Sequence, residues 1–312
     1  PMLAYMVREL IRKESCKDIN NRKELYDHFL EYIFEEHVRS KFDITFHDEE
    51  AIVEILQELS YKSIIDEDFQ CIPYSSVKES LDQRIIFDDL LKSGIADMLT
   101  FERKHLYFTH QSFVEYLAAV HISSSSELIT KVLQEKWNFK WKEVLKFLAG
   151  IKGESIIERI LTKKDNQIHA NLFLASDLLP ECKSVNSMLK QQIIQKLTLL
   201  TEDSSFRSEA ITALSHIDIN KTFSFLEENP DTTYEYDTLE CLIKIDGKRV
   251  FDLLSQNIDN PNSYISHMAI FHMPELTVYL TQEVVDSIES QIDSPVSHIS
   301  SSAIIALGKL NQ

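Results

Sequence analysis

The sequence predicts an almost entirely helical protein, and three observations support this fold class. Only 5 Gly and 7 Pro occur in 312 residues, so loops are few or short. Apolar residues make up 44% of the chain and recur at steps of three and four, the spacing of one helix face. Residues in the last third match each other at one fixed offset, as in stacked helical units. The length favours two or more units over a single core.

Residues 1–62 are expected to form a small helical bundle. Its helices should span residues 2–11, 22–38 and 48–61, with Pro1 in the first turn of the first helix, where a missing N–H costs nothing. The inward-facing positions are expected to be Leu3, Met6, Val7, Leu10, Ile11, Leu25, Phe29, Ile33, Ile52, Ile55, Leu56 and Leu59.

Residues 63–122 combine helices with two β-like runs. A helix over residues 77–91 is followed by strands at residues 97–101 and 105–108, which a three-residue connection would join as a hairpin. Another helix begins near Thr109, a residue type suited to its N-cap. Helices, then a hairpin, then a helix predict a winged-helix domain.

His110 follows the expected N-cap. In the first turn of a helix, unpaired backbone N–H groups and the helix dipole favour an anion, so position alone makes His110 a candidate phosphate contact. An ordinary surface or half-buried histidine is the simpler interpretation of a lone His at this point.

The serine run at residues 123–126 is the clearest linker and marks the expected boundary before a helical array at residues 127–312. The repeat period near 30, with two helices per unit, predicts an α-solenoid of HEAT-like repeats. The matched positions, each 28 residues apart, are Ala213 and Cys241, Leu214 and Leu242, Ile217 and Ile245, Asp218 and Asp246, Phe223 and Phe251, and Leu226 and Leu254.

Charge and composition exclude several classes of partner. The net charge is −18, and residues 201–312 hold 6 Lys/Arg against 18 Asp/Glu, a net −12 that is either a solvated face or a surface for a basic partner. Nucleic-acid binding is not expected, because no predicted helix carries a basic stripe. No membrane partner is expected, because no apolar run could span a bilayer. Four scattered cysteines indicate a reduced, cytoplasmic chain, and a start at Pro1 suggests an internal fragment.

The motifs of catalysis and metal binding are missing from the sequence. The Gly-Lys pairs are Gly247-Lys248 and Gly308-Lys309, and neither has a glycine-rich loop before it, so a phosphate-binding loop is absent. No serine-hydrolase elbow, zinc-protease motif or paired-cysteine site occurs. We therefore expect no enzymatic activity from this chain alone and no resident metal.

Three segments resemble one protein family. The stretch from Phe108 to Ala119 is similar to the F-x-H-x-x-F-x-E-[YF]-x-A-A signature of the winged-helix domain in NACHT-type STAND NTPases, which include animal NLR proteins and bacterial defence ATPases. Pro1-Met2-Leu3 with Asn21-Arg22-Lys23-Glu24-Leu25-Tyr26 resembles the N-P-L-L helix and R-x-x-L-Y segment that follow the nucleotide-binding core. Trp141-Lys142-Glu143-Val144-Leu145 with Leu148-Ala149-Gly150 resembles the W-x-E-V-[IL]…LAG run.

The resemblance implies a nucleotide switch whose ATPase core, with its phosphate loop and magnesium-binding acids, would precede Pro1. In the family's resting state the winged helix folds over ADP, its histidine reaches the β-phosphate, and the proline of the first helix packs near the adenine. By position these residues are His110 and Pro1, although the residue that should precede the proline is not in the sequence. Exchange of ADP for ATP would release this contact and allow self-oligomerisation.

The remaining implications concern the repeats and the fragment itself. The repeats would sense a protein ligand or trigger and restrain the closed form. ADP or ATP with magnesium is expected only in the full-length parent. The alternative function is a helical-repeat scaffold for protein partners with no nucleotide role, and DNA binding by the winged helix is a third hypothesis.

Overall fold

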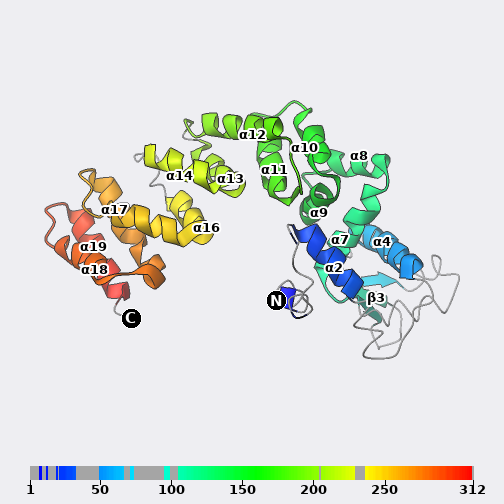
Figure 1. Ribbon diagram of the computed structural model, residues 1–312, viewed down its shortest axis with the longest axis horizontal. Coiled ribbons are helices and arrows are strands. Elements are labelled where there is room, and N and C mark those ends of the chain that lie inside the picture. The colour runs from blue at the N-terminus through cyan, green and yellow to red at the C-terminus, as the bar shows by residue number, and fades with distance from the viewer. Residues whose placement is uncertain are drawn as a thin grey trace. The chain divides into compact units, whose positions relative to one another are not determined.

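The computed structural model describes residues 7–8, 12, 19, 21–32, 49–66, 71–73, 95–98, 105–203, 205–228 and 236–310. They belong to two compact units, unit 1 (Pro1–Leu189) and unit 2 (Lys190–Gln312). Helices dominate the described residues, which confirms the predicted helical class (Figure 1). None of the described helices is both long and apolar enough to cross a membrane. Pro1 and the helix expected at residues 77–91 lie outside the described residues.

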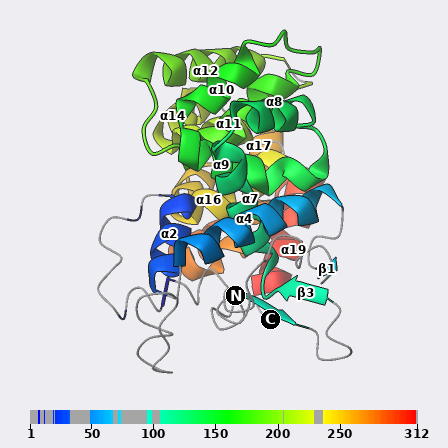
Figure 2. The same cartoon turned by 90° about the vertical axis from the view of Figure 1, so that its right-hand side faces the viewer.

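Unit 1 is built around one helix, α7, that is buried on more than one side. Helices α4 and α9 both pack against α7, and α4 crosses it in Figure 2. The described helices of the unit are α2 (Arg22–Tyr32), α4 (Glu49–Ile65), α7 (Gln111–Ser123), α8 (Ser126–Gln134), α9 (Lys142–Lys152), α10 (Glu154–Leu161) and α11 (Ala170–Leu178), with the 3-10 turns η2 (Phe139–Trp141) and η3 (Leu179–Glu181). The buried residues of α7 are Phe113, Val114, Tyr116, Leu117, Ala118, Ala119 and Ile122.

Helix α4 follows the predicted pattern closely but is longer than expected. Ile52, Leu56 and Leu59 are fully buried as predicted, while Ile55 is half-buried. The helix continues to Ile65 instead of ending at residue 61. Burial of Ile64 explains the extra turn, because this side chain extends the apolar face by another helical step.

Three short strands lie before α7. They are β1 (Cys71–Pro73), β2 (Ala96–Met98) and β3 (His105–Phe108). The strand order is β1-β3-β2, and β3 runs antiparallel to both neighbours, with Ala96 opposite Phe108. Sequence patterns predicted strands near β2 and β3 but no strand at β1.

The serine run is a tight helix–helix turn. Helix α7 ends at Ser123, and the Ser125 hydroxyl accepts a hydrogen bond from Leu128 N at 3.4 Å to cap α8. The two compact units divide later, between Leu189 and Lys190. The domain boundary expected at residues 123–126 stays a prediction, since a short turn can also separate domains.

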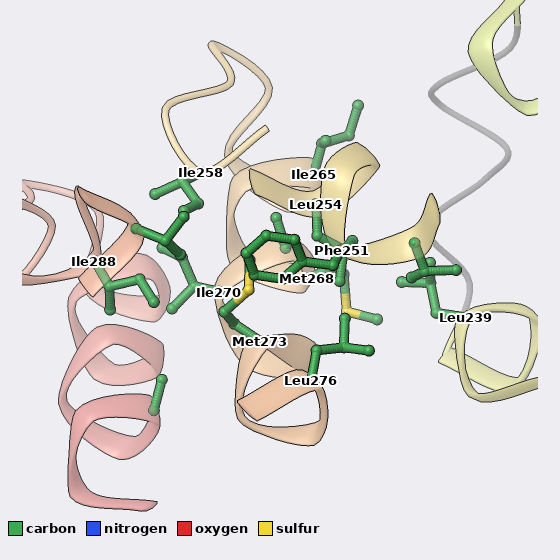
Figure 3. Packing of buried hydrophobic residues seen from close by; sticks show 14 of the residues in the cluster. Leu239, Phe251, Leu254, Ile258, Ile265, Met268, Ile270, Met273, Leu276 and Ile288 are labelled. Atoms are coloured by element: carbon green, nitrogen blue, oxygen red, sulfur yellow. The ribbon is translucent and has the colours of Figure 1, made fainter. Parts of the chain in front are cut away.

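Unit 2 is a succession of helices with one shared core. Figure 3 shows that residues from α16, α17, η4 and α18 meet in this core, among them Phe251, Met268 and Ile288. The helices are α13 (Arg207–Ile217), α14 (Ile219–Glu228), α16 (Tyr236–Ser255), α17 (Ser263–His272), α18 (Gln282–Ser290) and α19 (Ser297–Leu310), with the 3-10 segment η4 (Met273–Tyr279). Helix α12 (Ser187–Leu200) contains the boundary between the units.

Two aspartates 28 residues apart have nearly the same backbone conformation. Asp218, between α13 and α14, has φ −154° and ψ 91°, and Asp246 inside α16 has φ −147° and ψ 74°. Each Oδ1 accepts a hydrogen bond at 3.2 Å from the backbone N–H three residues later, Lys221 and Arg249. Each aspartate therefore ends one helix and caps the next. The 28-residue sequence offset thus corresponds to a shared local structure.

Substitution of Asp246 with alanine should destabilise unit 2 by about 1 kcal/mol, because the following helix loses its side-chain cap. Urea denaturation followed by circular dichroism would measure this loss. Asp293→Ala is the matched control, since Asp293 is exposed and caps no described helix. Equal unfolding curves for the two variants would contradict a capping role for Asp246.

Candidate functional site

The candidate site lies at the end of β3, where the chain turns into α7. Thr109 N and Thr109 Oγ1 both donate hydrogen bonds to Ile95 O, at 2.9 Å and 3.0 Å. Both polar groups are therefore directed to the neighbouring chain segment. The prediction that Thr109 caps the helix was wrong, and the N-cap is His110. Pro1, the other predicted site residue, lies outside the described residues.

His110 has an extended backbone, with φ −152° and ψ 135°, and an exposed side chain. Its Nδ1 accepts a hydrogen bond from Ser112 N at 3.1 Å and lies 2.6 Å from Ser112 Oγ. A ring nitrogen that accepts a backbone N–H cannot carry a proton, so the neutral ring holds its proton on Nε2. The cap thus makes Nε2–H the donor available to a ligand.

Tyr26 of α2 packs beneath this helix start and is completely buried. Its ring centroid lies 5.6 Å from Phe113, 5.2 Å from Tyr116 and 5.0 Å from Phe147. The contacts with Phe113 and Phe147 are edge-on, an arrangement that aromatic pairs prefer. One tyrosine therefore joins α2, α7 and α9 in a single aromatic cluster, which we call the junction.

A charged pair crosses the same junction. Arg22 Nη1 donates to Glu143 Oε2 at 2.7 Å, and the Arg22 guanidinium lies 4.6 Å from the centre of the Phe147 ring. Burial alone would raise the pKa of Glu143, but the hydrogen bond from Arg22 lowers it below the ordinary value. A second carboxylate, Glu181, lies 3.8 Å from Arg22. The pair thus links the start of α2 to α9.

Two further features bring α2 close to its neighbours. The Tyr116 hydroxyl donates a hydrogen bond to Asp27 Oδ1 at 2.5 Å, which ties α7 to α2. At Gly150 a Cβ atom would lie 3.0 Å from Lys23 Cβ and 3.4 Å from Glu181 O. Only a residue without a side chain leaves enough room for α9 to approach α2 so closely.

Glu115 lies one turn beyond His110 on α7, near the charged pair. Its Oε1 accepts a hydrogen bond from Gln111 Nε2 at 3.0 Å. Burial, together with the negative charge of Glu143, raises the pKa of Glu115 to about 7, against the opposing effects of Arg22 and Gln111. This carboxylate therefore changes protonation near neutral pH.

The structure brings together the described parts of the three segments that carry the family resemblance. Arg22 and Tyr26 come from the first, Phe113 and Tyr116 from the second, and Glu143 and Phe147 from the third. Arg22 and Glu143 are 121 positions apart in the chain. Sequence reasoning did not identify Tyr26, Arg22 or Glu143 as junction residues, because helical periodicity carries no information on which distant helix a residue faces.

A comparison of the chain with protein-family models, with curated proteins and with solved structures finds no match. Among the described residues, no three His, Cys, Asp or Glu side chains are grouped so that they could hold a metal ion.

Substitution of Glu115 with glutamine should flatten the pH dependence of stability. The pKa of this carboxyl is about 7 in the folded protein and near 4.5 in the unfolded chain, so the folded state holds the proton more tightly. The resulting stabilisation is fully present below pH 4.5 and is lost as the pH rises to 7. Because solvent reaches part of the group, we expect a loss of only about 1 kcal/mol between pH 5 and pH 8.

Urea denaturation at both pH values would show this loss in the unsubstituted chain and not in Glu115→Gln. Glu158→Gln, at an exposed position on α10, serves as the control and should behave like the unsubstituted chain. The same pH dependence in all three proteins would contradict a raised pKa at Glu115.

Removal of the Tyr26 ring should strongly lower the stability of unit 1. We expect Tyr26→Ala to cost about 3 kcal/mol or more, as for other buried aromatic side chains. Tyr26→Phe should be nearly neutral, because its hydroxyl lies near Ser112 but has no partner of good hydrogen-bond geometry among the described residues. Thermal unfolding of both variants would measure this difference, and similar losses would contradict the aromatic role of Tyr26.

Proposed function

We propose that the chain is the regulatory and sensor part of a NACHT-type STAND ATPase, an NLR-like protein that signals in bacterial antiviral defence or an innate-immune-type response. The supporting observation is the junction, where Arg22, Tyr26, Phe113, Glu143 and Phe147 join three segments that resemble the family. A resemblance by chance would not require these segments to meet in space.

In this proposal His110 holds the resting state. Its Nε2–H would donate a hydrogen bond to the β-phosphate of ADP, and the start of α7 adds the favourable end of the helix dipole. Both features suit an anion, although His110 supplies a single contact. The other phosphate contacts and the magnesium ligands would come from an ATPase core before Pro1. Pro1 would pack near the adenine, as the resemblance implies.

The junction would transmit a movement of α7 to the other helices of unit 1. Because α7 is tied to α2 through Tyr26 and Asp27, movement of His110 would have to move the packed helices with it. Exchange of ADP for ATP would remove the restraint and permit self-oligomerisation. The strands and α7 would form the winged helix, and unit 2 would form HEAT-like repeats that sense a protein ligand or trigger.

The second candidate function is a helical-repeat scaffold without any nucleotide role. It is favoured by the described residues of unit 2, whose helices share one continuous apolar core. Under this alternative the coding sequence before Pro1 would hold no phosphate-binding loop. Determining that sequence separates the two functions directly, since the STAND proposal requires such a loop.

Substitution of His110 with alanine in the full-length parent should weaken ADP binding about tenfold or more, the usual worth of a hydrogen bond to a charged group. Basal signalling should rise, because the resting state loses a contact. Isothermal titration with ADP would measure the affinity.

His28→Ala is the matched control, because the only ion pair of His28 among the described residues is with Glu31 in the same helix, α2. Unchanged ADP affinity and unchanged basal activity in His110→Ala would contradict the proposed role of this histidine.

A further inference from the structure

The turn between α8 and α9 exposes two large aromatic side chains. Trp137 is 56% exposed and Phe139 is 83% exposed, while Trp141 beside them is buried at 1%. The backbone of the turn is held by hydrogen bonds from Asn138 N to Glu135 O at 2.8 Å and from Trp141 N to Asn138 O at 3.0 Å. Trp141 Nε1 also donates to Glu135 Oε2 at 3.2 Å. The two exposed rings are therefore presented by a fixed turn, which we call the aromatic turn.

The segment that contains the aromatic turn carries more basic than acidic residues. Residues 127–168 carry 9 Lys/Arg against 6 Asp/Glu, a net +3 in a chain of net charge −18. The ion pairs of the described residues use other cations, such as Lys146 and Lys183. The lysines near the turn that make no ion pair with a described carboxylate are Lys131, Lys136, Lys142, Lys163 and Lys164.

Two of these lysines act on each other. Burial lowers the pKa of Lys136, the positive charge of Lys163 lowers it further, and the negative charge of Asp165 opposes this lowering. The net positive charge of residues 127–168, in a chain of net charge −18, suits this surface to a negatively charged partner.

We propose that the aromatic turn docks the protein on an anionic phospholipid surface. Trp and Phe rings enter the region between headgroups and acyl chains, while lysine ammonium groups stay at the level of the phosphates. Sequence patterns excluded a membrane partner because no apolar run could span a bilayer. Docking on a surface needs no spanning segment, and the exposure of Trp137 and Phe139 could not be known from the sequence.

A lipid surface fits the geometry better than a nucleic acid or a protein does. The Lys136 ammonium lies 4.9 Å from the centre of the Trp137 ring and covers one of the two faces on which a base would stack. A protein partner would need pockets for two neighbouring outward-facing rings, whereas a bilayer accepts them without a pocket.

Tryptophan fluorescence provides a direct test on the 312-residue chain. The chain has 2 Trp, and Trp137 is the exposed one, so a change on binding reports on the aromatic turn. With vesicles of phosphatidylcholine and about 30% phosphatidylserine, emission should shift to shorter wavelength. Brominated lipids should quench it. Pure phosphatidylcholine vesicles should bind at least about tenfold more weakly, because they carry no net negative charge.

Two variants retain Trp137 as the fluorescent reporter and test the aromatic and the basic side chains of the surface separately. Phe139→Ser and the double variant Lys142→Glu with Lys163→Glu should each lower vesicle affinity about tenfold. Their matched controls lie in unit 2, where Val278 is 90% exposed and Lys221 is exposed. Val278→Ser and Lys221→Glu should therefore bind vesicles as the unsubstituted chain does.

Three results would overturn the proposal. The first is an unshifted emission spectrum with phosphatidylserine vesicles. The second is equal binding to charged and uncharged vesicles. The third is quenching of Trp137 by single-stranded oligothymidine without any response to vesicles, which would assign the surface to nucleic acid. None of these results depends on the proposed nucleotide switch, because the measurement involves neither ADP nor His110.

Discussion

The packing of Tyr26 against α7 and α9 is the interaction on which unit 1 depends. Its ring touches Phe113, Tyr116 and Phe147, and the Arg22–Glu143 pair closes the same contact at 2.7 Å. Helices of 11 or 13 residues, such as α2 and α7, are short enough to need tertiary contacts to stay folded. Three separate chain segments therefore stabilise one another, and none would keep its position alone.

This constraint also determines how His110 is presented. The residue begins a helix whose next turn is buried at Phe113 and Val114, so the backbone at His110 has little freedom. Ser112 supplies the backbone N–H that fixes the imidazole through Nδ1. An exposed side chain on a rigid support loses little entropy when it binds, which is the arrangement a recognition residue requires. The same logic applies to the aromatic turn, where hydrogen bonds from buried Trp141 to Asn138 O and Glu135 Oε2 hold the turn that exposes Trp137.

The fold was predictable to the extent that local patterns determine it. The helical class and the buried face of α4 follow from apolar spacing, and the match of Asp218 with Asp246 follows from a repeat in the sequence. The junction was not predictable, because the local sequence around Arg22 and around Glu143 does not indicate that these two residues pair. The N-cap was misassigned for the same reason. Thr109 and His110 can both cap a helix, and the contact of Thr109 with Ile95, 14 residues away, decides between them.

Hydrogen–deuterium exchange, with and without ADP, of a protein that contains this chain together with the proposed ATPase core tests the central claim most directly. If His110 is the contact that holds the nucleotide, ADP should slow exchange of the backbone amides at residues 110–113, at the start of α7. Protection should then extend along α2 and α9, because the junction joins both helices to α7. Unchanged exchange throughout these segments, under conditions where ADP is bound, would contradict the account.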